Sequence, residues 1–439
     1  MNTTDAVSAG FTVGVWPGTA PRLLTPRTGV EDYAQYRAGG GYAALDDAAA
    51  LLDEVRAAGI RGRGGAAFPL AVKLRTVRAA AVAGRDTVLV ANGEEGEPAS
   101  VKDRWLLRHR PHLVLDGARL AALVVGAKHA HVYVSDPAAA QAIDTALREV
   151  QDAADHPLGG LTVSLRVVAP GYVAGEETAA VHAINGGPAK PTDKPPRPFE
   201  AGVGGLPTIV SNVETLANLP FVQRHGAGSY REAGTEASPG TFLATITGGG
   251  RPAGLYELPH GVRLSEVLVL HGIAPESVRG ALMGGYFAGL LGADVVDANL
   301  DHETLRGLGS GLGCGAVSIL TDECPVAVAA AVLAYFDREN AGQCGSCFNG
   351  TAAMAAAAGA LRDGVATEDD VARLRRWSVV LRGRGACGTL DAATNIAASL
   401  LEQFPDTVEQ HLGDGCTVCD AGVFTAQRPY QVEVAEAPQ

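Results

Sequence analysis

Apolar positions in the first half of the chain follow helical and strand spacings in turn. Apolar residues recur every three or four positions over 46–58 and predict a helix that ends at Gly59. A second helix is expected over 69–82, and the apolar run over 86–92 predicts a short buried strand. The pattern continues with helices over 110–126 and 137–153 and strands over 131–135 and 161–168. This alternation predicts an α/β domain with a largely parallel sheet.

The second half of the chain changes from strand spacing to helix spacing. Strands over 242–246 and 255–258 and a helix over 264–270 predict a small separate domain. Four helices with short connections, over 325–338, 348–363, 367–382 and 391–404, predict a bundle in which the cysteines lie between helices. We therefore divide the chain into an extended segment that wraps the surface (1–45), an α/β domain (46–239), a small β domain (240–324), a helical bundle (325–412) and a tail (413–439).

One long segment, 185–207, is rich in Gly and Pro and has no apolar period. We expect a long ordered loop there, and loops of this length inside a domain usually serve function.

Charge and composition exclude some classes of protein. The formal net charge of −13 argues against a nucleic-acid binder, which needs a clustered basic face. The first 25 residues lack the charged start and apolar core of a signal peptide. The longest apolar run, over 326–336, is too short to cross a bilayer. We expect a cytoplasmic protein that does not itself span a membrane but can belong to a membrane-associated complex.

A glycine-rich loop follows the first helix and reads Gly62-Arg63-Gly64-Gly65-Ala66-Ala67-Phe68. Glycine lets the backbone approach a phosphate without a side-chain clash, and the N–H groups that open the next helix favour an anion. Arg63 and Lys73 add positive charge. A plain connector is the common alternative, since glycine is the usual turn residue.

Acidic residues follow two of the predicted strands. The first cluster reads Asn92-Gly93-Glu94-Glu95-Gly96-Glu97-Pro98, and the second reads Gly171-Tyr172-Val173-Ala174-Gly175-Glu176-Glu177-Thr178. Carboxylates accept hydrogen bonds from ribose hydroxyls, and ligands bind at the carboxyl ends of parallel strands. The alternatives are a solvated acidic turn for the first cluster and simple complementation of a helix dipole for the second.

A fourth segment reads Leu206-Pro207-Thr208-Ile209-Val210-Ser211-Asn212-Val213-Glu214-Thr215. Together, these segments resemble the flavin- and NADH-binding subunit of respiratory complex I and its relatives in NAD-linked hydrogenases and formate dehydrogenases. The resemblance implies a Rossmann-like FMN domain, a β-grasp domain of the soluble-ligand-binding type and a C-terminal four-helix bundle with a 4Fe–4S cluster. It also implies that hydride passes from NADH to FMN and that single electrons leave through the cluster. A flavin suits this task because it accepts a hydride and releases electrons singly.

The same resemblance assigns roles to particular residues. The nicotinamide nucleotide would face Phe68, Lys73, Glu97 and Glu177, of which Lys73 and Glu97 are the catalytic candidates. Glu94, Glu95 and Ser211 belong to the predicted cofactor site as well. FMN would be lined by Gly62, Arg63, Gly64, Gly65, Asn92, Tyr172, Gly175, Glu176 and Asn212.

Three positions near this site depart from the family pattern. Ala67, Glu94 and Ser211 stand where the family usually has Gly, Asp and Asn. The longer side chain of Glu94 and the lost amide at Ser211 would shift the affinity or potential of the flavin without abolishing the site.

The cysteines depart further. The family has C-x-x-C-x-x-C and a later fourth cysteine, whereas this chain keeps Cys344, Cys347 and Cys387 but has Ala341 at the first position. Three thiolates remain where a 4Fe–4S cube normally requires four. A three-iron cluster, a fourth ligand from Asn340 or Gln343, a fourth ligand from a tail cysteine, and loss of the cluster are the open alternatives.

The tail carries its own cysteine pair. Cys416 and Cys419 have a C-x-x-C spacing, which is typical of half a metal site or a redox dithiol and also arises by chance. The family resemblance does not extend to this pair.

The sequence therefore predicts an FMN-dependent NADH:acceptor oxidoreductase that passes electrons through an atypical three-cysteine iron–sulfur site. We expect the partner to be another iron–sulfur protein, either a thioredoxin-like 2Fe–2S subunit or a small ferredoxin. Two other hypotheses are a non-catalytic nucleotide-binding scaffold or sensor, and a flavin reductase that has lost its cluster.

Overall fold

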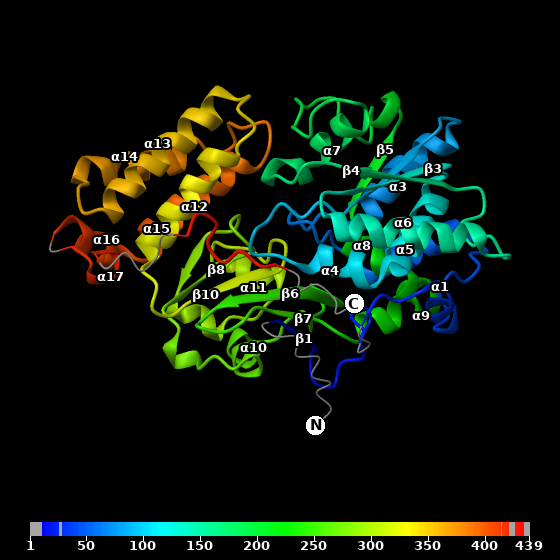
Figure 1. The fold of residues 1–439 in the computed structure, drawn as a ribbon, viewed down its shortest axis with the longest axis horizontal. Helices are drawn as coiled ribbons and strands as arrows, with labels where there is room; N and C mark the ends of the chain where they lie inside the picture. Colours follow the sequence, from blue (N-terminus) through cyan, green and yellow to red (C-terminus); the bar gives the residue numbers. More distant parts are fainter. Residues whose placement is uncertain (1–10, 26–28, 414, 421–425, 434–439) are drawn as a thin grey trace.

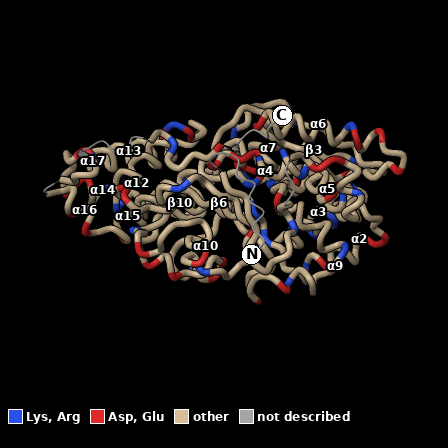
Figure 2. Tube along the Cα trace, turned by 60° about the horizontal axis from the view of Figure 1, so that its bottom comes forward, with Lys and Arg blue, Asp and Glu red and all other residues tan. Residues whose placement is uncertain are grey.

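The computed structural model describes residues 11–25, 29–413, 415–420 and 426–433. Three bodies lie side by side in Figure 1: a parallel sheet with its helices at one end, a mixed sheet in the middle, and a helical bundle at the other end. Asp and Glu are spread over the whole molecule with Lys and Arg scattered among them (Figure 2). Within the described residues, no helix has the length and apolar character needed to cross a membrane.

A four-stranded parallel sheet forms the first body. Its spatial order is β4-β3-β2-β5, with β2 (Val88–Asn92), β3 (His129–Val134), β4 (Thr162–Val167) and β5 (Thr208–Asn212). The chain moves from β2 to β3 and β4 on one side and then returns to place β5 on the other side of β2. In open α/β sheets, such a reversal of direction marks the crevice where ligands bind.

Helices cover both faces of this sheet, as the alternating pattern predicts. The helix expected to end at Gly59 does so because this glycine adopts a left-handed conformation that a Cβ disfavours. Helix α5 is buried on nearly every side, and its buried residues include the Asp116–Arg119 ion pair as well as apolar side chains. The helices are α1 (Tyr33–Ala38), α2 (Ala48–Ala58), α3 (Leu70–Val82), α4 (Lys102–His109), α5 (Pro111–Val125), α6 (Pro137–Asp152), α7 (Glu177–Ile184), α8 (Val213–Ala217) and α9 (Leu219–Arg231). Two short 3-10 helices, η1 (Tyr172–Gly175) and η2 (Val203–Gly205), lie in the connections.

A six-stranded mixed sheet forms the second body, in the order β1-β7-β6-β10-β8-β9. Apolar residues of α10 pack against the strands in one core, which gives the expected β-grasp arrangement. The N-terminal segment was expected only to wrap the surface, but its strand β1 pairs in parallel with β7 at the sheet edge. The elements are β1 (Thr12–Val15), β6 (Thr241–Gly248), β7 (Gly254–Pro259), α10 (Leu264–His271), η3 (Pro275–Ser277), β8 (Gly280–Met283), β9 (Leu290–Gly292), η4 (Ala293–Asp297), α11 (His302–Gly307) and β10 (Ala316–Leu320).

Four helices packed into a bundle form the third body: α12 (Pro325–Glu339), α13 (Gly345–Arg362), α14 (Glu368–Val380) and α15 (Thr389–Gln403). Two short helices follow, α16 (Pro405–Leu412) and α17 (Thr417–Asp420). The prediction that Cys344, Cys347 and Cys387 lie between helices is wrong for Cys347, which lies in the first turn of α13 with Cys344 as the N-cap. Gly345 and Ser346 have weak helix propensity, which hid this start from the sequence pattern.

Candidate functional site

A cavity of about 350 Å³ opens where β2 and β5 end. The two strands are in register, so Asn92 lies opposite Asn212 at the carboxyl edge of the sheet. The cavity therefore occupies the reversal point of the sheet topology. Its lining residues come from all three bodies: Gly64, Gly65, Ala66, Asn92, Glu94, Glu95, Gly96, Glu97, Ser100, Asp103, Tyr172, Val173, Gly175, Glu176, Asn212, Gly284, Phe287, Cys314, Cys387, Gly388 and Thr389.

The two asparagines are held by hydrogen bonds to neighbouring loops. Asn92 donates through Nδ2 to the carbonyl of Gly175 at 2.8 Å. Asn212 donates to Asp103 Oδ2 at 2.6 Å, and its Oδ1 accepts from the Glu214 N–H at 3.0 Å to cap α8. Because their side chains are tied to the scaffold, both residues present a fixed edge to the cavity.

Behind this edge lies a buried cation that sequence reasoning missed. Lys102 is 1% exposed, and its Nζ lies 2.7 Å from Asp103 Oδ1 and 3.0 Å from Glu214 Oε2. It also donates to Asn212 Oδ1 at 3.4 Å. A lysine beside an aspartate at the start of a helix is typical of a surface, so nothing in the sequence indicated its burial.

The acidic loop divides into carboxylates with different environments. Glu95 turns inward and accepts from Ser100 Oγ at 2.6 Å and from the N–H groups of Asp103 (3.2 Å) and Arg104 (3.0 Å). These donors open helix α4, so Glu95 acts as a helix cap as well as lining the cavity.

Glu94 is buried and incompletely bonded. Its Oε1 accepts weakly from Gly171 N–H and Ser135 Oγ, both at 3.4 Å. Its Oε2 is buried and has no hydrogen-bond partner among the described residues. Burial raises the pKa of Glu94 to about 8, so a ligand that supplies a hydrogen-bonding group would satisfy an otherwise costly atom. A Cβ at Gly175 would lie 2.6 Å from this oxygen, which explains the glycine.

Glu97 sits at the junction with the mixed sheet. Its carboxylate accepts from the N–H of Tyr286 at 2.9 Å and of Ala99 at 3.4 Å. Burial raises the pKa of Glu97 to about 8. Gly285 packs directly against it, since a Cβ there would lie 2.4 Å from the carboxyl carbon. A carboxyl group with a pKa near neutrality can exchange a proton under working conditions, which suits the predicted catalytic role.

This raised pKa gives a prediction for stability. The folded protein binds the Glu97 proton more tightly than the unfolded chain, so the free energy of unfolding falls as pH rises from about 4.5 through about 8. Glu97→Gln removes the titrating group. Both proteins are compared without flavin. We expect the melting temperature of Glu97→Gln to fall less between pH 6 and pH 9 than the melting temperature of the unchanged protein. Glu402→Gln, on the exposed surface, is the control. An identical pH slope in Glu97→Gln and the unchanged protein would contradict the assignment.

The glycine loop contributes backbone rather than charge to the cavity. Gly62 N–H bonds to the Phe68 carbonyl at 2.9 Å and closes the loop, while Gly64 and Gly65 line the cavity. Neither Gly62 nor Arg63 lines it. The Arg63 guanidinium points into the interior, donating to the Thr241 carbonyl at 2.9 Å. Arg63 thus joins the α/β domain to the mixed sheet.

Ala67 has φ of +51°, in the left-handed region. A non-glycine residue there costs about 1 kcal/mol. Ala67, where the family has glycine, therefore adds backbone strain as well as an extra methyl group.

The remaining predicted residues lie outside the cavity lining. Lys73 Nζ donates to the Val210 carbonyl at 3.1 Å and lies 3.7 Å from Glu177. Phe68 is 47% exposed, and Ser211 is buried in β5. Lys73, Glu177 and Phe68 are accessible enough to meet a second ligand arriving from outside.

The long loop over 185–207 reaches both the acidic helix and the bundle. Lys194 Nζ lies 2.5 Å from Glu176 and 3.8 Å from Glu177. Lys190 Nζ donates to the Ala341 carbonyl at 2.9 Å. Neither lysine was predicted, because only the tertiary structure brings this loop to the site.

The bundle supplies the opposite wall of the cavity. Tyr172 packs edge-to-face on Tyr335 and Phe336 of α12, with ring centroids 5.9 and 5.1 Å apart. Cys387 lines the same cavity as Glu97 and the glycine loop. Burial raises the pKa of Cys347 to about 12, with further contributions from the neighbouring Cys387 and Cys344. The three predicted cysteines therefore gather beside the cavity.

The structure narrows the identity of the fourth cluster ligand. The Asn340 side chain is committed to the local turn, donating to the Asp337 carbonyl at 2.6 Å and accepting from Gly342 N–H at 2.9 Å. The tail cysteines adjoin Cys324 at the start of α12, whereas Cys344 follows its end. The 15 residues of α12 span about 22 Å, so the tail cysteines lie too far away to supply the fourth ligand.

A reversal-point cavity with buried acids and a glycine loop, beside a group of three cysteines, defines a flavin-dependent oxidoreductase with an iron–sulfur site. Comparison with known proteins agrees. Residues 55–221 match the Nuo51 FMN-binding domain, and residues 327–411 match the NADH-ubiquinone oxidoreductase-F iron–sulfur binding region.

Individual relatives extend over nearly the whole chain. A subunit of an NADH-quinone oxidoreductase of Rhizobium meliloti is 31% identical over 86% of this chain and 93% of its own. The HndC subunit of the NADP-reducing hydrogenase of Solidesulfovibrio fructosivorans is 30% identical over 93% of this chain and 85% of its own. The crystal structure of an NAD+-reducing [NiFe]-hydrogenase in the H2-reduced state aligns with a TM-score of 0.76 and 32% identity, over 83% of this chain and 63% of that chain.

The chain belongs to the family of NADH-binding FMN/iron–sulfur subunits found in NADH-quinone oxidoreductases. The predicted family, enzyme class and cofactors are thereby confirmed. The relatives are subunits of larger complexes, so a protein partner belongs to the function.

Proposed function

We propose that this protein takes hydride from NADH at the cavity and delivers single electrons through the three-cysteine site to an iron–sulfur partner protein. One observation carries the proposal: Cys387 lines the same cavity as the glycine loop, Glu97 and Tyr172. The cavity where hydride would enter and the cysteine site where electrons would leave are therefore adjacent. No further electron carrier is needed between them.

The residues of the cavity fit a flavin mononucleotide. Gly64, Gly65 and Ala66 offer a backbone surface for a phosphate-bearing chain, and Asn92 and Asn212 offer fixed amides. The orphaned Glu94 Oε2 fits a donor from the ligand, such as a hydroxyl or ring N–H. When bound, FMN supplies the conversion of a two-electron hydride into single electrons.

The accessible residues Phe68, Lys73 and Glu177 fit the nicotinamide nucleotide. Phe68 exposes an aromatic face at the mouth of the glycine loop, suitable for stacking on a base or nicotinamide ring. Lys73 offers a cation to a phosphate, and Glu177 beside it offers an acceptor to a ribose hydroxyl. Glu97 holds or releases a proton at its buried carboxyl group, where its pKa is raised to about 8.

The three thiols fit a cluster with three cysteine ligands, for which we propose the three-iron form. Ala341 offers no donor atom in its side chain, and Asn340 is committed to the turn. The fourth thiolate that a four-iron cube normally requires is therefore missing from its family position.

The surface around these cysteines fits an acidic electron-transfer partner. Arg375, Arg376, Arg382 and Arg384 are exposed on α14 and the loop that leads to Cys387. That loop contacts the start of α13, since Ser346 Oγ donates to the Arg384 carbonyl at 2.6 Å. Phe348, Val379 and Val380 expose apolar area beside them. Exposed arginines with exposed apolar residues among them, in a chain of net charge −13, favour a small acidic iron–sulfur protein by charge complementarity.

Charge reversal at this surface tests the partner. Arg375→Glu with Arg376→Glu is expected to slow reduction of an acidic 2Fe–2S ferredoxin about tenfold at low ionic strength, with the difference vanishing at high salt. Stopped-flow kinetics measures the rate, and bleaching of the flavin by NADH should be unchanged. Arg56→Glu with Arg148→Glu, on exposed helices of the α/β domain, is the matched control. Equal rates for both double variants would contradict the docking surface.

Anaerobic purification tests the function as a whole. We expect bound FMN, its bleaching by NADH, and iron detected by chemical analysis and EPR. Protein that carried no flavin and did not pass electrons from NADH to added FMN would overturn the proposal. Bound flavin without iron would instead indicate a flavin reductase that has lost its cluster.

A further inference from the structure

A second group of metal-ligating side chains lies at the other end of α12, away from the cavity. The ligand atoms of Cys324, His411, Cys416 and Cys419 all lie within 4.8 Å of one another. His411 Nε2 is 3.2 Å from Cys324 Sγ and 3.8 Å from Cys419 Sγ. The proposed flavin and iron–sulfur chemistry uses none of these residues.

The spacing fits one tetrahedral ion. Zinc binds thiolates at about 2.3 Å, which places ligand atoms of a tetrahedral site about 3.8 Å apart. The distances between the ligand atoms here include 3.2 and 3.8 Å and do not exceed 4.8 Å, so they are close to this value. The irons and sulfides of a cubane cluster occupy the space between their ligands, so thiolates packed this closely suit a single ion instead.

The histidine is prepared as a ligand by its second ring nitrogen. Nδ1 lies 3.0 Å from the Leu361 carbonyl, which can only accept. Nδ1 must therefore carry the proton, and the lone pair of Nε2 faces the cysteines. Such a hydrogen bond fixes the tautomer and ring orientation of metal-binding histidines. His411 is 2% exposed and Cys324 is also 2% exposed, so this is a built interior site.

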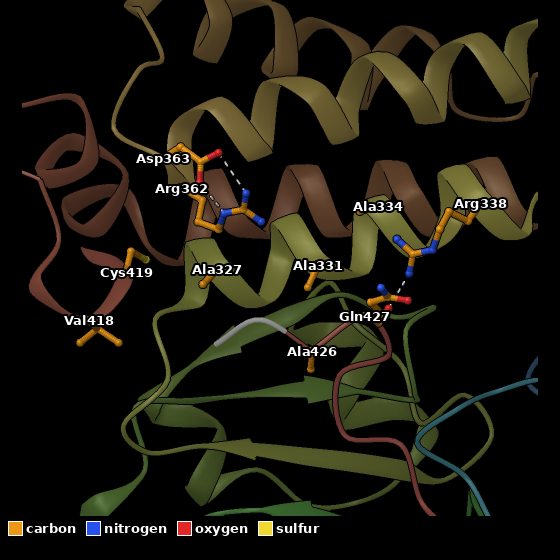
Figure 3. A pocket seen from close by; sticks show the side chains of 10 residues that line it. All are labelled: Ala327, Ala331, Ala334, Arg338, Arg362, Asp363, Val418, Cys419, Ala426 and Gln427. Carbon is orange, nitrogen blue, oxygen red and sulfur yellow. Dashed lines mark hydrogen bonds and ion pairs between the residues drawn. The ribbon is translucent and has the colours of Figure 1, made fainter. Parts of the chain in front are cut away.

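The four ligands come from three parts of the C-terminal region. Cys324 is the N-cap residue of α12, and His411 lies in the last turn of α16. Cys416 immediately precedes α17, and Cys419 lies within it. Figure 3 shows Cys419 beside Ala327 in the first turn of α12 and near the Arg362–Asp363 pair. Three thiolates and one divalent ion leave a net negative charge, to which the Arg362 guanidinium is complementary.

Beyond this site the chain runs back along α12 as residues 426–433, here called the strap. Arg338 at the far end of α12 donates to the Gln427 carbonyl at 2.6 Å, as Figure 3 shows. The buried Val432 donates its N–H to the Pro98 carbonyl at 3.0 Å, and its own carbonyl accepts from Arg104 at 3.0 Å. The strap thus links the bundle to the loop that carries Glu97.

We propose that Cys324, His411, Cys416 and Cys419 bind a structural zinc ion, which anchors the strap to the bundle. Four protein ligands close the coordination sphere, as in structural rather than catalytic zinc sites. Thiolates with one imidazole in tetrahedral array favour zinc over magnesium, calcium or manganese. α17 is too short to be held by hydrophobic packing, and binding of the ion would stabilise it instead.

Metal analysis of the intact, anaerobically purified protein tests this site separately from the iron–sulfur site. We expect about one zinc per chain, with X-ray absorption showing three sulfur ligands and one nitrogen ligand. The Cys416→Ser, Cys419→Ser double variant should lose zinc and keep iron. Cys347→Ser should lose iron and keep zinc, and Cys314→Ser should keep both.

Hydrogen–deuterium exchange provides a second readout of the strap. The double variant should exchange faster at the Val432 amide and in its strap, with unchanged protection in α2 as a control for folding. Protein grown with zinc that contains none overturns the proposal whether or not the variants fold. Loss of iron in the double variant, or a Cys416–Cys419 disulfide in the anaerobic protein, would also overturn it.

Discussion

Replacing Ala341 with cysteine is expected to raise bound iron from about three to about four atoms per chain, because the new thiolate completes the four-cysteine pattern of a cube. The side chain would enter three residues before Cys344, at the family spacing. The Ala341 carbonyl already bonds Lys190 at 2.9 Å, so the backbone is held in place for the new side chain. EPR measures the change: a three-iron cluster is paramagnetic when oxidised, whereas a four-iron cluster of this type is paramagnetic when reduced.

The reciprocal change removes a ligand instead of adding one. Cys347→Ser should lose iron altogether and lose electron delivery to a ferredoxin, while NADH still bleaches the flavin. Ser346→Ala, which changes the neighbouring side chain but no thiolate, is the matched control. Four irons in the unchanged protein, with the same EPR spectrum in Ala341→Cys, would show that another ligand already completes the cube.

Gly175→Val is expected to weaken FMN binding at least tenfold, which is about 1.4 kcal/mol. A Cβ at this position would lie 2.6 Å from Glu94 Oε2 and 3.2 Å from the Glu94 carbonyl. The larger side chain would therefore push the buried carboxylate into the cavity and fill its floor. Flavin content after purification and the dissociation constant from fluorescence titration of the flavin-free protein measure the effect.

A neighbouring glycine supplies the control for this prediction. Gly171→Ala should leave FMN binding unchanged, because its Cβ would meet only Ala174 at 3.9 Å and its φ is extended. Glu94→Ala combined with Gly175→Val should recover part of the affinity by removing the clash. Normal flavin content in Gly175→Val would show that FMN does not occupy this part of the cavity.

Local sequence predicted the elements and the residues from which we propose the two ends of the electron path. Apolar spacing predicted α2, α3, α5 and most of the bundle, because buried apolar positions recur at helical spacing along each of them. The quoted sequence motifs predicted most of the residues that line the cavity at the carboxyl ends of β2 and β5. The carboxyl ends of parallel strands lie at the same edge of a sheet, so motifs that follow such strands come together. The missing thiolate at residue 341 was visible once the cysteine spacing was compared with the family pattern.

Tertiary structure decided which side chains have the functional environment. Glu94, Glu95 and Glu97 are alike in sequence, yet Glu95 caps a helix while burial raises the pKa of the other two to about 8. Arg63 lies in the predicted loop but points into the interior, while the unpredicted Lys102 lies behind Asn212. Burial depends on packing between distant segments, and no local pattern encodes it.

The tail cysteines show most clearly what the sequence determined and what the tertiary structure decided. Sequence determined that Cys416 and Cys419 form a pair with metal-ligand spacing, and it could go no further. Only the fold brings Cys324, 92 positions before Cys416, and His411 to the same point, at the end of α12 opposite the iron–sulfur cysteines. A metal site needs ligand atoms within a few ångströms in three dimensions, and chain topology supplies that proximity for residues far apart in sequence.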